Sequence, residues 1–142
     1  MGFRRACKAA MILLVSILSL GAPAMGQQAR FEPEPEVERL PDRAHGEKLF
    51  KECRKCHEIS PGQVKIGPSL AGIVGRRAGS TPGFGYSQDM IDLGAAGTVW
   101  NQTSLDRFLS RPRAMVAGTK MVFQGFRKQA DRDDLIAYLS TI

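Results

Sequence analysis

Five consecutive residues carry the strongest chemical signal in the chain, Cys53-Arg54-Lys55-Cys56-His57. The spacing C-x-x-C-H is the attachment signature of a c-type haem. The two thiols can add to the vinyl groups of a porphyrin as thioethers, and the adjacent imidazole can then ligate the iron. The motif therefore predicts one haem c, covalently bound through Cys53 and Cys56, with His57 as the proximal iron ligand.

Two other uses of this motif fit the sequence poorly. A structural zinc ion needs four ligands. Beyond the three of the motif, only His45 remains, and it is poorly placed to be the fourth. A thioredoxin-like dithiol requires a βαβ context, whereas we find no strand signal and no internal repeat in the sequence. The haem is the favoured interpretation.

A second axial ligand would decide what the haem can do. His45 lies on the expected helix that leads into the motif, so we interpret it as a surface residue rather than a ligand of the opposite face. The remaining donors are thioether sulfurs, those of Met90, Met115 and Met121. Met121 is the best candidate, because it lies in a glycine-containing loop that permits close approach to the haem. The other two are interpreted as core residues.

Ligation by Met121 would close the iron to small molecules and raise its reduction potential, because a thioether favours ferrous iron. This arrangement is typical of an electron carrier. A haem enzyme or gas sensor with a labile distal methionine remains the alternative, and the state of the Met121 ligand distinguishes the two functions.

Helices at both ends of the expected domain must hold the haem between them. The first begins near Ala44 and the last is N-capped by Asp131, with acidic Asp133 and Asp134 in its first turn. Each repeats an i, i+3, i+4, i+7 stripe, formed by Gly46, Leu49, Phe50 and Cys53 in the first and by Leu135, Tyr138, Leu139 and Ile142 in the last. Gly46 has no side chain, so a second helix can approach closely there.

A third, shorter helix is expected over 104–110, capped by Thr103 and ending before Pro112. Glycine and proline are so frequent in 61–98 that loops should dominate there. The fold class predicted is all-α, with about three main helices and long loops around the haem. Because so few helices offer little apolar core, folding should depend on haem attachment.

The N-terminal part of the chain has the composition of an export signal. Residues 1–24 combine a basic start, a short apolar run and the ending Ala22-Pro23-Ala24, which predicts a cleaved secretory signal peptide. Cleavage after Gly26 is the alternative to cleavage after Ala24. Residues 25–43 are acidic and proline-rich, as in a flexible extension, and residues 44–142 form the expected haem domain. The predicted location is the bacterial periplasm. A retained N-terminal anchor, which would make the protein a membrane-tethered carrier, is the alternative.

The chain has a formal net charge of +6 at pH 7. Such a charge favours association with acidic protein surfaces, while export argues against nucleic acid as a partner. Haem attachment would use both cysteines of the mature chain, so we expect no structural disulfide.

From about His45 to Ile142, the sequence resembles mitochondrial-type class I cytochrome c and its bacterial cytochrome c2 relatives. Five blocks and the single tryptophan carry the resemblance, in the order found in the family. They are GEKLFKECRKCH (46–57), GPSLAGIVGRRAG (67–79), TPGFGYS (81–87), Trp100, AGTKMVFQGF (117–126) and RDDLIAYL (132–139).

The resemblance implies a role for each matching residue. His57 and Met121 would be the axial ligands, and the carbonyl of Pro68 would accept a hydrogen bond from the second ring nitrogen of His57. Around a buried haem propionate, the resemblance implies donation from Tyr86 and Trp100 and charge compensation by Arg76. Phe123 would pack beside the exposed haem edge. Partner docking is implied for Arg113, Lys120, Arg127 and Lys128.

The resemblance also implies a function, a one-electron carrier that is not an enzyme and has no small-molecule substrate. A monomer is the default expectation. Its partners would be redox complexes with acidic docking surfaces: a quinol–cytochrome c reductase as donor, and a terminal oxidase or photosynthetic reaction centre as acceptor. A dehydrogenase is the alternative donor. Some positions depart from the mitochondrial pattern. Phe108 replaces a tyrosine, Ala117 a proline and Glu52 a basic residue, and the stretch between Tyr86 and Trp100 is about three residues longer.

Overall fold

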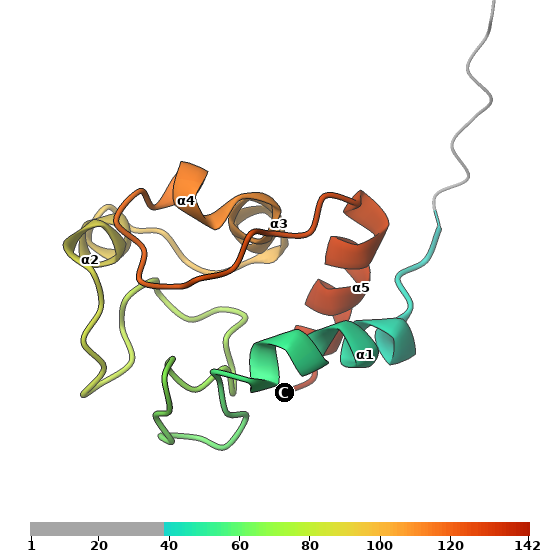
Figure 1. Cartoon of the computed structure of the whole chain (residues 1–142), viewed down its shortest axis with the longest axis horizontal. Helices are drawn as coiled ribbons and strands as arrows, with labels where there is room; N and C mark the ends of the chain where they lie inside the picture. The colour runs from blue at the N-terminus through green and yellow to red at the C-terminus, as the bar shows by residue number, and fades with distance from the viewer. Residues whose placement is uncertain (1–38) are drawn as a thin grey trace, which may run out of the picture. The chain divides into compact units, whose positions relative to one another are not determined.

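The computed structural model describes residues 39–142, in which helices alternate with long loops (Figure 1). Within these residues there is no β-strand, and one isolated antiparallel bridge pairs Arg77 with Val99. The all-α prediction is confirmed. The expected signal peptide, and all of the extension before Arg39, lie outside the described residues. The helices are α1 (Arg43–Arg54), α2 (Gln88–Ala95), α3 (Gln102–Ser110), α4 (Pro112–Met115) and α5 (Gln129–Leu139).

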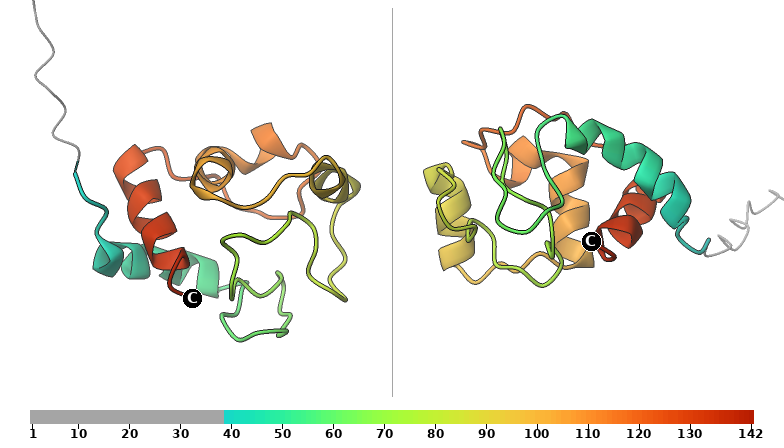
Figure 2. Two further views of the ribbon diagram at one scale, coloured as in Figure 1. Left: turned by 180° about the vertical axis from the view of Figure 1, so that it is seen from behind. Right: turned by 90° about the horizontal axis from the view of Figure 1, so that it is seen from below.

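The first and last helices pack against each other, as the two apolar stripes predict. In Figures 1 and 2, α1 and α5 cross on one side of the domain, α2 lies on the other side, and α3 lies between them. Phe50 of α1 and Leu135 of α5 are completely buried. The ring of Phe50 lies 5.2 Å from that of Tyr138, centroid to centroid. This contact brings the C-terminal end of α1, which carries the haem motif, beside α5.

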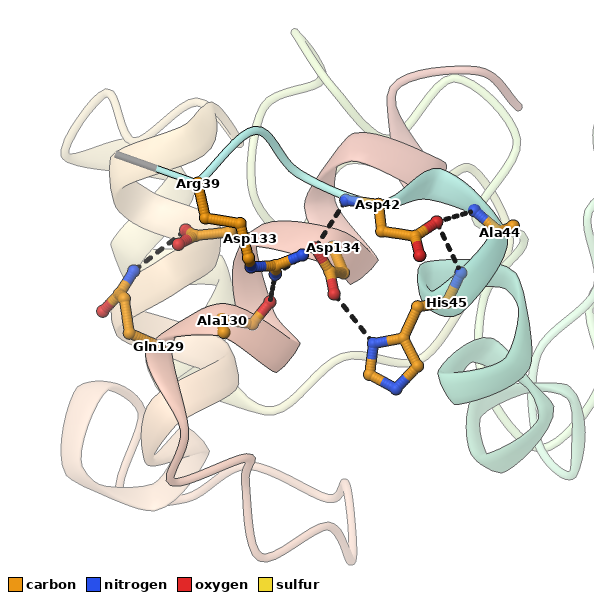
Figure 3. Close-up of polar contacts among 8 residues, drawn as sticks. All are labelled: Arg39, Asp42, Ala44, His45, Gln129, Ala130, Asp133 and Asp134. Carbon is orange, nitrogen blue, oxygen red and sulfur yellow. Dashed lines mark hydrogen bonds and ion pairs between the residues drawn. The ribbon is translucent and has the colours of Figure 1, made fainter. Parts of the chain in front are cut away.

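The ordered contacts begin before the expected domain boundary at Ala44. The carboxylate of Asp42 caps α1 by accepting hydrogen bonds from the main-chain N–H groups of Ala44 and His45, at 2.9 and 3.1 Å. Asp134 of α5 accepts hydrogen bonds from Arg39 and from the main-chain N–H of Asp42, both at 2.6 Å (Figure 3). Residues 39–43, expected to belong to a flexible extension, therefore lie against α5.

Two helices begin earlier than predicted. Helix α3 is capped by Asn101 and not by Thr103, because Asn101 and Ser104 form a reciprocal capping box. Helix α5 begins after Lys128, so Asp131 lies in its first turn and is not the cap. Asp134, expected in that first turn, lies deeper in the helix and is 2 % exposed. Pro112 ends α3 as predicted and begins α4.

Helix α2 was not predicted, since it lies in the glycine- and proline-rich stretch that was expected to consist of loops. It lies in the stretch between Tyr86 and Trp100, which is about three residues longer than in the mitochondrial form. It is fixed to the domain by Met90, which is 8 % exposed, and by Gly94. A Cβ atom on Gly94 would lie 2.1 Å from the carbonyl oxygen of Ala78, so only glycine allows this close packing.

None of the helices formed by residues 39–142 is both long enough and apolar enough to cross a bilayer.

Candidate haem site

A single cavity of about 440 Å³ brings together every residue predicted to contact the haem. Its walls come from the end of α1, the loop that follows, α2, α3, the loop before α5, and α5 itself. The nine predicted residues that line it are Cys53, Cys56, His57, Pro68, Arg76, Tyr86, Trp100, Met121 and Phe123.

The composition of the walls fits a haem. Most of the remaining lining is apolar, as a porphyrin ring requires, and consists of Leu70, Ile73, Leu105, Phe108, Leu109, Leu135 and Leu139 among others. The hydroxyl of Ser87 also lies in this lining, is buried, and has no hydrogen-bond partner within the described part of the chain. A buried hydroxyl of this kind needs a partner, and a haem propionate is one that the site would supply.

The His57 imidazole is held in one orientation. Its Nδ1 lies 2.7 Å from the carbonyl oxygen of Pro68, so Nδ1 donates its hydrogen and Nε2 keeps a free lone pair for a metal. The main chain of Gly67 lies against the imidazole of His57, since a Cβ atom on Gly67 would be 2.4 Å from Cε1 of His57. Burial lowers the pKa of His57, a shift that the hydrogen bond to Pro68 opposes and the charge of Arg76 reinforces. The neutral imidazole that metal ligation requires is therefore favoured.

Both cysteines of the motif are free of disulfides and partly buried. The main-chain N–H groups of Cys56 and His57 donate to the carbonyl of Cys53 at 3.0 and 2.9 Å, which closes a tight turn at the end of α1. In the unattached chain, burial and the neighbouring charge of Glu52 raise the pKa of the Cys53 thiol to about 11. A redox dithiol depends on a lowered thiol pKa, so the site does not suit that chemistry.

Within 39–142, no group of three or more His, Cys, Asp or Glu side chains is placed to hold a metal ion. His45 does not approach the haem cavity, because its Nδ1 lies 2.8 Å from Asp134 on α5. The donor set of the cavity, two thiols with one imidazole and thioethers, is that of a haem c.

Arg76, Tyr86 and Trp100 line the same cavity. The isolated bridge beside Arg76 places the main chain of Trp100 against that of Arg76, with the N–H of Trp100 donating to the carbonyl of Arg76 at 2.9 Å. Burial lowers the pKa of Arg76, and the nearby Tyr86 opposes this shift. The guanidinium donates to the carbonyls of Ser69 and Ala71 at 2.7 and 3.2 Å. A guanidinium, a phenol and an indole therefore share the wall of the cavity.

Two thioethers, those of Met90 and Met121, line the cavity. Met115 does not. It lines a separate hollow of about 260 Å³ beside α3 and α4. Phe123 packs edge-on against Phe126 with their ring centroids 5.1 Å apart. The structure therefore narrows the candidates for a second axial ligand from three methionines to two.

The four cations predicted for partner docking are all exposed: Arg113, Lys120, Arg127 and Lys128. Lys120 alone among them lines the cavity. Two exposed apolar side chains also line the cavity, Val122 at 87 % and Ile66 at 75 % exposure. No role was predicted for either from the sequence. Their exposure could not be read from sequence, because it depends on how the loops that carry them fold.

Comparison with known proteins agrees with this site. A family model described as cytochrome c matches residues 43–142. The chain is 44 % identical over 101 residues to cytochrome c2 of Rhodomicrobium vannielii, covering 70 % of this chain and 78 % of that protein. It is 46 % identical over 112 residues to cytochrome c of Theileria annulata, covering 76 % and 93 %.

A solved structure gives the same result. Cytochrome cH from Methylobacterium extorquens superposes with a TM-score of 0.65 at 39 % identity, covering 71 % of this chain and 99 % of that one. The helices and the lined cavity are those of a class I c-type cytochrome. The chain belongs to the cytochrome c family, of the type that includes mitochondrial cytochrome c and bacterial cytochrome c2.

Family membership fixes the cofactor and the broad activity. One haem c is attached covalently through the C-x-x-C-H motif, at Cys53 and Cys56. The protein is an electron carrier and not an enzyme.

Proposed function

We propose that His57 and Met121 are the two axial ligands of the haem iron, and that the protein carries single electrons between larger redox complexes. The observation that carries this proposal is the shared cavity, which both side chains line together with the attachment cysteines and the predicted propionate partners. The covalent haem supplies a reversible couple between Fe(II) and Fe(III).

The chain's own residues would tune this couple. The hydrogen bond from His57 to Pro68 fixes the imidazole tautomer and makes its nitrogen a stronger donor. Arg76, Tyr86 and Trp100 would compensate a buried propionate. Phe108, 8 % exposed and 5.1 Å from Trp100 between ring centroids, lies where the mitochondrial form has a tyrosine. Phe108 therefore brings no hydroxyl of its own to that wall of the cavity.

We further propose that the protein acts in the bacterial periplasm, after cleavage of residues 1–24. Its relatives include bacterial cytochromes c2 and a cytochrome c-550, which supports a bacterial carrier. Its partners would be a quinol–cytochrome c reductase and a terminal oxidase or reaction centre with acidic docking surfaces, met by a monomer through Arg113, Lys120, Arg127 and Lys128. Intact-mass measurement of the mature protein tests the cleavage. A retained N-terminus would make it a membrane-tethered carrier.

The iron ligands can be tested by spectroscopy of the purified ferric holoprotein. The wild type should show the weak far-red absorption band of an iron–methionine bond at neutral pH. Met121→Ala should lose the band, and the matched variant Met90→Leu should keep it. Loss of the band in Met90→Leu alone would make Met90 the ligand. Absence of the band in the wild type would instead favour a haem enzyme or sensor with an open distal face.

A further inference from the structure

Two hydrogen bonds fasten the loop of residues 117–121, which carries Met121 and is called the methionine loop below, to residues 85–89. The main-chain N–H of Gly118 donates to Oδ2 of Asp89 at 2.7 Å. The second bond lies two residues later in the loop and four residues earlier in the other segment: Nζ of Lys120 donates to the carbonyl of Gly85 at 2.6 Å. These contacts join the loop to the N-terminal end of α2.

Helix α2 is a firm support for this contact. Asp89 lies in its first turn, where a carboxylate also interacts favourably with the helix dipole. The next residue, Met90, is buried in the cavity wall, and Gly94 packs closely against the carbonyl of Ala78. The backbone that carries Asp89 is therefore held on two sides.

The methionine loop, by contrast, has few restraints of its own. Gly118 and Lys120 are exposed. The local bonds are one turn, from the N–H of Thr119 to the carbonyl of Val116 at 3.1 Å, and a long contact of 3.3 Å from the N–H of Met121 to Oγ1 of Thr119. Ala117 lacks the fixed φ that a proline would give this loop. The position of the loop therefore depends on contacts with other segments.

Gly118 and Asp89 also fit each other by shape. A Cβ atom on Gly118 would lie 3.1 Å from Oδ2 and 3.2 Å from Cγ of Asp89. A side chain at position 118 would therefore push the carboxylate back by a few tenths of an ångström. The contact is an exposed, charge-assisted hydrogen bond, a stronger kind than one between neutral groups.

We propose that Asp89 is a positioning residue for Met121, whose carboxylate holds the methionine loop at Gly118 and so keeps the thioether directed at the haem iron. This inference rests on the proposed ligation by Met121. Asp89 itself touches neither the iron nor its ligands. Ala117 does not restrain the loop as a proline would, and the hydrogen bond from Gly118 to Asp89 supplies a restraint from outside the loop.

Binding of imidazole to the ferric holoprotein measures how readily the loop opens, because imidazole must displace Met121 from the iron. Asp89→Ala should bind imidazole roughly tenfold more tightly than the wild type, as expected for loss of one charge-assisted hydrogen bond. Asp89→Asn should fall between the two, since its amide oxygen still accepts a hydrogen bond. Amide exchange at Gly118 should also accelerate in Asp89→Ala.

Asp92→Ala is the matched control. Asp92 is exposed on the same helix and carries the same charge, but its carboxylate accepts from Nε2 of Gln88 at 2.7 Å and makes no contact with the methionine loop. Its imidazole affinity should stay within about twofold of the wild type.

The outcomes separate this inference from the proposed function. If the wild type lacks the far-red band, ligation by Met121 is wrong and the role of Asp89 falls with it. If the band is present but Asp89→Ala and Asp92→Ala bind imidazole equally, the role of Asp89 is wrong while the proposed function stands. A lower thermal midpoint in Asp89→Ala with unchanged imidazole affinity would mean a merely structural contact, and would also overturn the inference.

Discussion

Gly46 of α1 lies directly against the main-chain carbonyl of Asp134 in α5. A Cβ atom at position 46 would be 2.0 Å from that oxygen, 2.6 Å from its carbon and 3.0 Å from Cβ of Tyr138. The two helices therefore touch through their backbones. This close approach is what lets Phe50 and Leu135, on either side of the crossing, become completely buried.

Gly46→Ala should destabilise the holoprotein by about 2 kcal/mol, because the atoms that a methyl group would meet belong to a helix backbone and cannot move aside. The free energy of unfolding, from urea titration, measures the effect. Gly85→Ala is the control. At Gly85 the nearest atom to an added Cβ is Nζ of Lys120, at 3.9 Å, and a change within about 0.5 kcal/mol is expected. Equal stability of the two variants would show that the helices can separate without cost.

The side chain of Asp134 ties the start of the domain to α5 (Figure 3). Its burial alone would raise its pKa. Hydrogen bonds from the N–H of Asp42, from His45 and from Arg39, together with the charge of Arg39, outweigh burial and hold the pKa of Asp134 below its usual range. The folded protein therefore binds a proton at this carboxyl less readily than the unfolded chain does.

Because the pKa of Asp134 is lowered in the folded protein, stability should depend on pH in a definite way. The unfolded carboxyl titrates near pH 4, so the stabilisation by Asp134 is complete above about pH 5 and is lost as the pH falls through the lower pKa of the folded state. Asp134→Asn should cost about 2 kcal/mol at pH 7, and its deficit should shrink below pH 4. Urea unfolding from pH 7 to pH 3 measures both.

Asp133→Asn is the matched control for this experiment, since Asp133 carries the same charge but bonds to Gln129 on the surface side of α5 (Figure 3). It should lose less than about 0.5 kcal/mol, with little change in pH dependence. A deficit in Asp134→Asn that stayed constant down to pH 3 would contradict the assigned ionisation.

Local patterns in the sequence predicted most of this fold. Each of the two packed helices has its own apolar stripe, which includes Gly46 and Phe50 in the first helix and Leu135 in the last. Because each stripe spans only about two turns of one helix, each helix could be recognised from its own sequence and their packing inferred. Helix α2 was missed because the glycines and prolines around it dominated the interpretation. The signal was present nevertheless, since Met90, Leu93 and Gly94 follow i, i+3, i+4 spacing.

The polar contacts were not predictable, because they join distant parts of the chain. Asp134 looks like an ordinary helix carboxylate until Arg39 and His45 are brought beside it. Asp89 likewise gives no local sign that it reaches Gly118. The haem cavity was easier to predict, because a resemblance to a known family supplied its residues together, whereas the residues alone had supplied only the motif and Met121 as the best of three methionines.

The predicted docking surface can be tested by neutralising charge. We expect the triple variant Arg113→Gln, Arg127→Gln, Lys128→Gln to react about tenfold more slowly with a purified bacterial quinol–cytochrome c reductase at low ionic strength, because electrostatic steering is weakened. Stopped-flow reduction of the ferric holoprotein measures the rate. Lys120 is left intact, since it also holds the methionine loop.

A second triple variant removes three other exposed cations that do not line the haem cavity, Arg43→Gln, Lys48→Gln and Arg77→Gln. It has the same net charge as the first and should react at nearly the wild-type rate. Equal slowing of both variants would mean that net charge, rather than the predicted docking residues, sets the rate.

Removal of the haem should abolish the fold. An empty cavity of about 440 Å³ would cost on the order of 10 kcal/mol, which is comparable to the whole stability of a small domain. The variant Cys53→Ser, Cys56→Ser, purified free of haem, should therefore show a coil-like circular dichroism spectrum and no cooperative thermal transition. The unsubstituted chain produced without haem attachment should behave in the same way, which would assign the effect to the haem and not to the serines. A cooperative transition in either haem-free chain would show that the helices pack without the cofactor.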